Sequence, residues 1–319
     1  MLPLQFQFLD KAIGEPGLLL QLGGHTFLFD APLTLYDRTI KTSMLNNIYA
    51  VLLTHRHRDH FGGIDRLFFE SETLPIVVGN TGTQKGMTDR LTSYDLNLTE
   101  LSITAHDILW KDQPEIILRH KDFHIEAIAL THGSIHSIAY ALQEKSQYKI
   151  IKDKLDQSGF RPGPWVREAK LALEAPLPPS SMNIHGTEVP WEDIATLFFH
   201  EKGQRIVYAS DFDISTENHQ RLVSLLNGCD HFFCEAAYLA DDHALAIENN
   251  HQTSHSTARL ALDGQVKTLH VFHHSRRYQN ISNAIELFHT QIQSIYPHSV
   301  SSPSVTAQPI SSPTATTPT

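Results

Sequence analysis

Cysteine is scarce in this sequence, which has only Cys229 and Cys234 among its 319 residues. Both lie in an apolar run around two phenylalanines, where a free cysteine behaves as a small buried hydrophobe. A small secreted fold stabilised by disulfides needs more cysteines than this, so we do not expect that class of protein.

Basic residues are also in deficit, because 25 Lys and Arg face 35 Asp and Glu, for a net charge of −10. This balance excludes nucleic-acid binding through a uniformly basic surface but leaves a local basic patch open. Apolar runs are short, and none approaches the roughly 18 residues of a transmembrane helix. The N-terminal sequence MLPLQFQFLD lacks the basic stretch and long apolar run of a signal peptide. We therefore expect no membrane segment and a cytoplasmic protein.

Charged residues are absent from residues 301–319, of which ten are Ser or Thr and four are Pro. Such a segment cannot bury enough apolar surface to offset its ordering entropy. We predict a disordered tail over 300–319 and a single domain over 1–299. Within that domain, residues 145–185 are rich in proline, and 144–170 carry seven basic and four acidic residues. We predict an inserted arm-like segment there; charge alone also fits a solvated loop.

Short runs of β-branched and aromatic residues alternate with stretches of helical periodicity. The predicted strands are 17–22, 26–30, 49–53, 125–130, 195–200, 205–209, 231–234 and 268–272. The predicted helices are 217–227, 256–263 and 280–294. Strands that alternate with helices indicate a layered α/β domain.

Histidine, by contrast, is abundant, with 21 residues in 319. Four metal-binding side chains stand within six residues in LTHRHRDHFGG, directly after the apolar run YAVLL: His55, His57, Asp59 and His60. They converge on one point if the loop wraps around it. Neutral imidazoles and a carboxylate suit Zn²⁺, with Mn²⁺ or Fe²⁺ as alternatives.

This motif after a hydrophobic strand resembles the metallo-β-lactamase superfamily. The resemblance implies an α/β fold, a four-layer αββα sandwich, with a dinuclear metal site at one edge of the sheets. The family pattern requires three further ligands downstream, and each is available after a hydrophobic run. They are His132 in IALTHGS, Asp211 in RIVYASDFD and His273 in TLHVFHHSRRY.

The resemblance also implies how the ligands divide between two metal ions per chain. His55, His57 and His132 would hold one Zn²⁺, Asp59, His60 and His273 the other, and Asp211 would bridge them. Two neighbours compete for these positions. His136 is an alternative to His132, and His274 to His273; the family pattern favours His132, and the spacing to the following RRY favours His273.

Several later segments resemble ribonuclease Z, the tRNA 3′-end endonuclease, over roughly residues 17–298. HSRRY after His273 is similar to that family's H-x-S-x-R-Y run. SHSTARLAL resembles a helix that bears a functional histidine, which corresponds to His255, and FFCEAAY matches a family strand at Glu235. GFRPGPWVREAKLALE resembles the insertion that grips tRNA, with the pair Gly163 and Pro164.

The ribonuclease Z resemblance implies hydrolysis of RNA phosphodiester bonds, with 3′ processing of precursor tRNA as the expected reaction and a homodimer as the expected assembly. Asp59 would orient the attacking water, His255 would protonate the departing 3′ oxygen, and Glu235 would hold that imidazole. Ser275 and Arg277 would bind phosphate, the arginine through its bidentate fork.

The sequence departs from the ribonuclease Z pattern at a few positions. Arg58 stands where the family usually has glycine, and FGGI and DAPLTLYDR replace the usual neighbouring sequences. A small phosphodiester, a lactone or a thioester is therefore an alternative substrate on the same fold. A non-catalytic binding module is a further alternative, and it predicts missing ligands.

Overall fold

The computed structural model describes residues 4–9, 14–37, 40–95, 105–108 and 113–302. The chain divides into two compact units. One is Lys145–Gln204, called the arm below, and the other is the rest of the chain, called the body.

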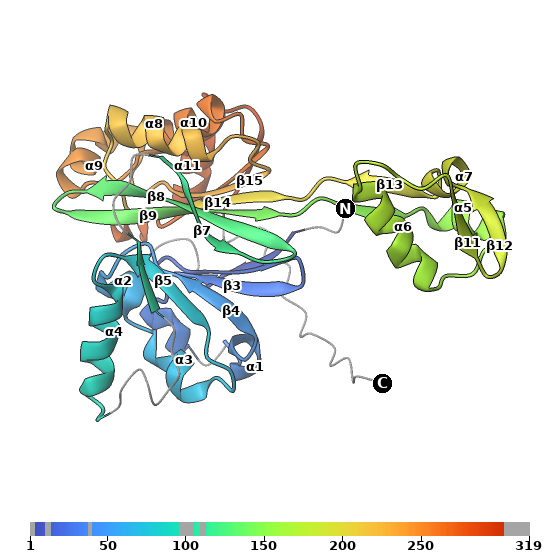
Figure 1. Cartoon of the computed structure of the whole chain (residues 1–319). Coiled ribbons are helices and arrows are strands. Elements are labelled where there is room, and N and C mark those ends of the chain that lie inside the picture. Colours follow the sequence, from blue (N-terminus) through green and yellow to red (C-terminus); the bar gives the residue numbers. More distant parts are fainter. Residues whose placement is uncertain (1–3, 10–13, 38–39, 96–104, 109–112, 303–319) are drawn as a thin grey trace. The chain divides into compact units, whose positions relative to one another are not determined.

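The first sheet of the body has six strands in the order in which they occur in the chain (Figure 1). The first three are antiparallel neighbours, and the last four, from β3 onward, run parallel. They are β1 (Gln5–Phe8), β2 (Leu18–Leu22), β3 (His25–Phe29), β4 (Ile48–Leu52), β5 (Ile76–Asn80) and β6 (Ala105–Ile108).

The second sheet of the body has seven strands in the order β17-β16-β15-β14-β9-β8-β7. Strands β14 to β17 are parallel, and β14, β9, β8 and β7 are antiparallel neighbours. They are β7 (Glu115–Arg119), β8 (Phe123–His132), β9 (Ile135–Glu144), β14 (Arg205–Ala209), β15 (His231–Glu235), β16 (Thr268–Phe272) and β17 (Ser299–Ser301).

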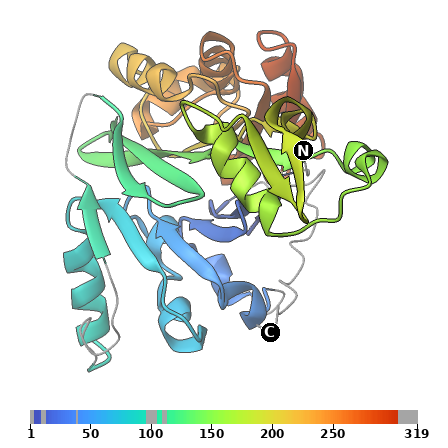
Figure 2. The same cartoon turned by 45° about the vertical axis from the view of Figure 1, so that its right-hand side comes forward.

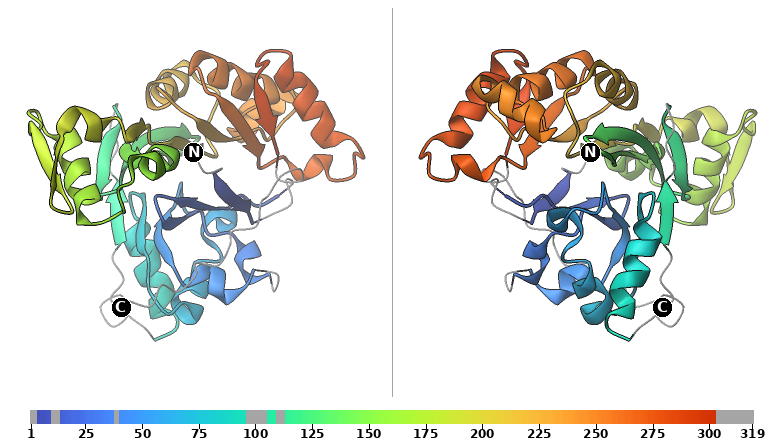
Figure 3. Two further views of the ribbon diagram at one scale, coloured as in Figure 1. Left: turned by 90° about the vertical axis from the view of Figure 1, so that its right-hand side faces the viewer. Right: turned by 90° about the vertical axis from the view of Figure 1, so that its left-hand side faces the viewer.

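Helices cover the outer face of each sheet, so the body has four layers (Figures 1 and 3). On the first sheet lie η1 (Leu33–Tyr36), α1 (Thr42–Leu45), α2 (Arg58–Phe61), α3 (Asp65–Glu70) and α4 (Thr83–Thr92). The part of the chain after β14 contributes α8 (Thr216–Leu225), η2 (Ala240–Asp242), α9 (His243–Asn249), α10 (Ser254–Asp263), η3 (Arg276–Tyr278) and α11 (Ala284–Gln293).

Three hydrophobic cores separate the four layers, because alternate residues of each strand point to opposite faces of a sheet. On β3, Phe27 and Phe29 lie in the core between the two sheets, and Leu28 packs toward the helices of the first sheet. On β14, Tyr208 lies in the inter-sheet core, whereas Val207 packs in the core that contains residues of α8, α10 and α11. Strands buried on both faces explain the near-continuous apolar runs of the sequence.

The arm has its own small core around Trp165, Ala169 and Phe198. Figure 2 shows its helices and strands from a second direction. Its elements are β10 (Gln147–Ile150), α5 (Lys152–Ser158), α6 (Pro164–Glu174), β11 (Ser181–Ile184), β12 (Thr187–Pro190), α7 (Trp191–Ala195) and β13 (Phe198–Glu201). This unit runs past residue 185, the predicted end of the inserted segment, because β13 pairs with β10 and closes it.

The predicted strands and helices are all present, with ends that differ by a few residues. The long strand β9 and the short helices near the first motif were not predicted. Of the predicted tail over 300–319, residues 300 and 301 belong to β17, and 303–319 lie outside the described residues. Within the described part of the chain, no helix is long and apolar enough to cross a membrane.

Candidate metal centre

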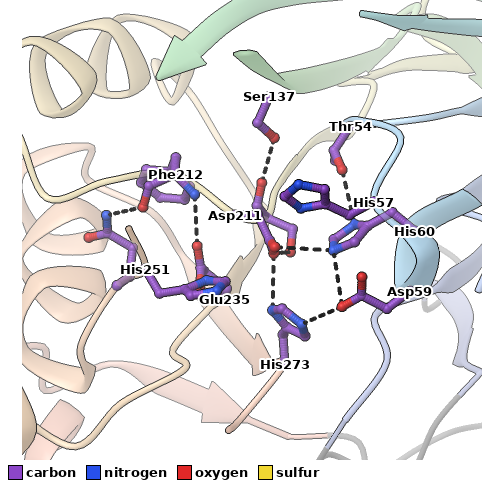
Figure 4. Close-up of polar contacts among 12 residues, drawn as sticks. Thr54, His57, Asp59, His60, Ser137, Asp211, Phe212, Glu235, His251 and His273 are labelled. Atoms are coloured by element: carbon purple, nitrogen blue, oxygen red, sulfur yellow. Dashed lines mark hydrogen bonds and ion pairs between the residues drawn. The ribbon is translucent and has the colours of Figure 1, made fainter. Parts of the chain in front are cut away.

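Polar side chains from both sheets gather where the strands end (Figure 4). Strand β4 leads into the loop and short helix that carry the four residues of the first motif. In the second sheet, His132 ends β8, Asp211 follows β14 and His273 follows β16. The structure thus brings all seven predicted ligands to one place in the body.

The metal-binding atoms of these seven residues form two groups. His55, His57, His132 and Asp211 make up one group, and Asp59, His60 and His273 the other, and within each group the donor atoms lie within 4.8 Å of one another. Asp211 reaches both groups, because its Oδ2 lies 3.2 Å from His60 Nε2 and its Oδ1 lies 3.0 Å from His273 Nδ1. This position is the one that a bridging carboxylate requires.

The two competing histidines belong to neither group of donor atoms. The His274 ring stacks on Phe288 with a centroid distance of 4.0 Å, and its Nδ1–H donates to the Ala236 carbonyl at 2.7 Å. Burial lowers the pKa of His274 to about 4, so this ring is a neutral core residue. His136, on β9, is in neither group of donor atoms. The geometry therefore favours His132 and His273.

The backbone is strained at three strand ends around the ligands. Asp30, Asp211 and His273 have φ angles of 55°, 53° and 59°, in the left-handed region that residues other than glycine rarely adopt. Such conformations cost about 1–3 kcal/mol each and persist where the surroundings over-determine them, often at functional sites. Their concentration at one edge supports a functional role for this edge.

Asp30, which the sequence analysis did not single out, orients the ligand His60. Its fully buried carboxylate accepts hydrogen bonds from the backbone N–H of Thr54 at 2.8 Å and from the Tyr208 hydroxyl at 3.0 Å. The His60 Nδ1–H lies 2.9 Å from Asp30 Oδ2, which leaves Nε2 facing Asp211. A carboxylate in this position fixes the tautomer and the direction of a ligating imidazole. The only local signal was an acidic residue at the end of the predicted strand 26–30.

A backbone carbonyl orients His132 in the same way. The His132 Nδ1–H donates to the Asn250 carbonyl at 2.9 Å. Asn250 ends α9 in a left-handed conformation, and the Asn250 side chain lies against Gly133, where an added Cβ would come within 2.9 Å of its Nδ2. The Nε2 of His132 is thereby free to face Asp211, 3.8 Å away.

The titratable side chains of the site shift one another's pKa values. Burial by itself raises the pKa of Asp211, but the imidazoles of His60 and His273 outweigh burial and hold this pKa well below its usual value. Burial lowers the pKa of His273, yet the carboxylates of Asp211 and Asp59 raise it to about 10. Strong proton affinity at a buried imidazole reports a negative potential, which also attracts metal cations.

The residues present fit divalent metal ions. The Nε2 of His60 and the Nδ1 of His273 are buried and make no hydrogen bond, although both face Asp211. Imidazole nitrogen and carboxylate oxygen are the ligands that Zn²⁺, Mn²⁺ and Fe²⁺ accept. Two groups of such donors around one shared carboxylate can hold two ions.

His251 is the functional candidate that the sequence analysis missed. Its ring lies 5.5 Å from the His273 ring and 5.2 Å from the His132 ring, between centroids. The Nδ1 of His251 lies 2.8 Å from Glu235 Oε2, and the other oxygen of Glu235 accepts the backbone N–H of Phe212 at 3.0 Å. Glu235 therefore contacts the imidazole of His251, and not that of His255 as predicted.

The structure contradicts the role predicted for His255. This residue is exposed in the first turn of α10 and contributes to no group of metal-binding side chains among the described residues. The helix begins at Ser254, because Thr253 and Ser256 form a capping box. His251 precedes this cap and so remains beside the ligands, four residues upstream of the predicted position.

A pocket of about 490 Å³ opens over the ligand groups. Its lining includes Asp59, His251 and His273, together with Ser275, Tyr238, Arg58 and Arg276. Ser275 thus lies at the pocket, and its contact with phosphate stays a prediction. Arg277 is not in the lining, and its guanidinium pairs with Asp242 at 3.5 Å. The neighbouring Arg276 lines the pocket instead, with its guanidinium 3.7 Å from Glu15.

The other two predicted substrate-binding residues lie in the arm. Gly163 caps α6 and Pro164 is its first residue. Trp165 is buried in the arm core and its indole N–H donates to the Arg161 carbonyl at 2.9 Å, so this ring anchors the arm. Several basic side chains of the arm are exposed, including Lys152, Arg161 and Arg167.

Residues 25–151 match the family model of the beta-lactamase superfamily domain. Two curated relatives are both ribonuclease Z. The protein of Deinococcus radiodurans is 26% identical over 303 residues, which cover 85% of this chain and 86% of the relative. That of Bacillus cereus is 27% identical over 314 residues, which cover 89% and 95%.

Solved structures agree on the fold. The metallo-β-lactamase fold protein YhfI of Bacillus subtilis has a TM-score of 0.59 at 15% identity, and the alignment covers 94% of this chain and 96% of that one. This chain has the metallo-β-lactamase fold. The short form of human tRNase Z has the same fold, with a TM-score of 0.57 at 18% identity over 85% of this chain and 93% of that one.

The comparisons confirm the resemblance that the motifs indicate, both to the superfamily and to ribonuclease Z. Within the metallo-β-lactamase fold, the described ligand groups lie at the edge of the two sheets, and the fold implies divalent metal binding there.

Proposed function

We propose that this protein is a metal-dependent endoribonuclease that hydrolyses phosphodiester bonds at the 3′ side of precursor tRNA. The observation that carries the proposal is His251, held by the buried Glu235 and facing two groups of metal ligands in one pocket. The curated relatives named ribonuclease Z, which align over most of the chain, support the same reaction.

The seven ligands suit two Zn²⁺ ions per chain, with Mn²⁺ or Fe²⁺ as alternatives. When bound, two divalent cations lower the pKa of water and neutralise the charge of a phosphodiester. In the proposed arrangement, Asp211 joins the two positions, and Asp30 and the Asn250 carbonyl hold the imidazoles in the orientation that ligation needs.

The protein's own groups supply the proton transfers. Asp59, half-exposed at the pocket, accepts a hydrogen bond from the attacking water and so orients it. His251 donates a proton to the departing 3′ oxygen, a contribution of about 10²–10⁴-fold for a positioned acid. Glu235 accepts the Nδ1–H of His251 and leaves the other ring nitrogen for this transfer.

Phosphate recognition falls to the rim of the pocket and to the arm. Arg58 and Arg276 line the pocket beside Ser275, and arginine matches phosphate oxygens with a planar fork. Arg58 replaces the small residue expected at this position, and so adds a cation beside Asp59. The exposed basic side chains of the arm offer further phosphate contacts, which suits a long polyanion better than a small ester. Contact of the arm with RNA, the homodimer and the cytoplasmic location stay predictions.

The proposal is tested with the full chain, reconstituted with Zn²⁺ or Mn²⁺. Precursor tRNA with a 3′ trailer and bis(p-nitrophenyl) phosphate are the two substrates, with a lactone and a thioester as comparators. We expect cleavage of both phosphodiesters, at a single mapped position in the tRNA.

Two variants of neighbouring histidines make the matched pair. His251→Ala should lower kcat on tRNA by about 10²–10⁴-fold without loss of bound metal. His255→Ala, on the exposed face of α10, should leave kcat unchanged. Cleavage of the small diester alone would refute the tRNA assignment, and hydrolysis of only the lactone or thioester would refute phosphodiester chemistry altogether.

A further inference from the structure

A second cluster of metal-binding side chains lies at the other end of two strands that lead to the metal centre. Strand β3 runs from His25 toward Asp30, and β8 runs from Phe123 to the ligand His132. His25 begins β3, and His120 and Asp122 lie in the turn before β8. This cluster contains no residue of the metal centre.

The three side chains already approach the spacing of a coordination sphere. His25 Nε2 and His120 Nδ1 both lie 3.5 Å from the same atom, Asp122 Oδ2. Donor atoms of the three residues lie within 4.8 Å of one another. Ligands about 2.0–2.1 Å from a tetrahedral Zn²⁺ are separated from each other by about 3.3 Å, so two of the three separations need almost no movement.

The Nδ1 atom of His120 is engaged by only one long hydrogen bond. The backbone N–H of Asp122 approaches His120 Nδ1 at 3.3 Å, which is long for a hydrogen bond. Acceptance of this bond requires the lone pair, and not the proton, on His120 Nδ1, so an ion bound at this nitrogen would replace the single long contact with the Asp122 N–H. The two 3.5 Å contacts to the Asp122 carboxylate are equally long, so direct pairing leaves the three side chains only weakly satisfied.

Packing against neighbouring aromatic rings holds the two histidines of the cluster in place. The His25 ring lies 4.7 Å from the His120 ring and 5.1 Å from Tyr49, between centroids, and His120 stacks on Phe123 at 4.8 Å. The three donor side chains keep exposed fractions of 25% for His25, 22% for His120 and 42% for Asp122. An ion can therefore enter from solvent, and water can complete its coordination.

We propose that His25, His120 and Asp122 bind one divalent transition metal ion, Zn²⁺ for this set of two imidazoles and a carboxylate. His25 belongs to the first sheet, and the other two ligands precede the strand β8 of the second sheet. The ion is a structural clip between the two sheets, at the end of the sandwich away from the metal centre. This site is independent of the proposed nuclease function.

Equilibrium dialysis of the full chain against micromolar Zn²⁺, followed by metal analysis, tests the proposal. Asp122→Asn and His120→Ala should each bind one equivalent of zinc less per chain than the unaltered protein. The control is His124→Ala, because His124 is adjacent in sequence but pairs with Glu126 at 2.9 Å and belongs to no ligand group among the described residues.

Thermal unfolding supplies a second measurement, because an ion bound only by the folded state raises Tm with its concentration. At zinc concentrations that saturate the metal centre, further Zn²⁺ should still raise the Tm of the unaltered protein and of His124→Ala, but not that of Asp122→Asn. Asp122→Asn keeps the shape of the side chain, so its folding should be retained, and its phosphodiesterase activity should be unchanged. Equal zinc content in all four proteins would refute the clip, whatever the outcome of the nuclease assays.

Discussion

The two ends of strands β3 and β8 use the same residue types in different settings. At the candidate metal centre the proposed ligand His60 is fully buried, and its second ring nitrogen is held by the Asp30 carboxylate. At the other end, His25 and His120 are partly exposed and are held chiefly by ring packing. Burial and outer hydrogen bonds therefore distinguish the proposed catalytic centre from the proposed structural site, whose side chains are open to solvent.

The largest expected effect comes from the shared carboxylate of the metal centre. Asp211→Ala removes the group that faces both His60 and His273, so bound metal and phosphodiesterase activity should be lost together. Metal analysis and the bis(p-nitrophenyl) phosphate assay on the same preparation measure both. Full metal content in this variant would show that Asp211 is not needed to bind metal. The metal centre would then not depend on a shared buried carboxylate, as proposed.

A smaller effect is expected from loss of the hydrogen bond between Asp30 and His60 at the metal centre. Asp30→Asn keeps the shape of the side chain but removes one acceptor from His60 Nδ1–H, Thr54 and Tyr208. Changes at such positions typically cost about 10–100-fold in metal affinity or activity. Zinc titration and kcat should both show the loss, whereas Asp122→Asn should leave kcat untouched. Equal kcat in Asp30→Asn and Asp122→Asn would mean that the hydrogen bond between Asp30 and His60 is not needed for activity.

The smallest expected effect concerns a histidine at neither end. His270 stacks on Phe233 and lies 3.0 Å from His231, between Nε2 and Nδ1. Burial, and the neighbouring His231, lower the pKa of His270 to about 3. The folded state therefore keeps this ring neutral while the unfolded state takes up a proton below about pH 6.5, so stability is full above that pH and falls as the pH drops.

Between pH 7.5 and 5, this single ring should reduce the free energy of unfolding by about 2 kcal/mol. Urea unfolding at the two pH values measures the difference. His270→Asn should be less stable at both values but should show a smaller pH dependence, and His255→Asn, at an exposed position, should keep the full dependence. A pH dependence in His270→Asn as large as in the unaltered protein would contradict this account.

The ligands of the metal centre were predictable because the first motif and the three downstream segments each come after an apolar strand and match the superfamily pattern, and the ends of such strands meet at one edge of a sheet. His251 was missed because it lies in the loop between α9 and α10, where no periodicity marks it, and the H-S-T sequence after it directs attention to His255. Its partner Glu235 is 16 residues away and meets it only in the folded chain.

The second cluster had no signal in the sequence at all. His25 and Asp122 are far apart along the chain, and neither stands in a recognisable motif. They meet where the turn before β3 lies against the turn before β8, so that a Cβ added at Gly23 would be in ordinary contact with Asp122 Cβ at 3.8 Å. Contacts between two sheets depend on how the sheets stack, which residue patterns along single strands do not encode.

The left-handed turn at Asn250 has a consequence for cooperativity. Its carbonyl holds His132, a ligand, and the next residue along the chain is His251, the proposed acid. Because binding free energies are linked reciprocally, an ion that fixes the His132 ring also stabilises the turn that presents His251, and substrate bound against His251 tightens the ion in return. We therefore expect metal binding and the positioning of His251 to be coupled, through the peptide unit between Asn250 and His251.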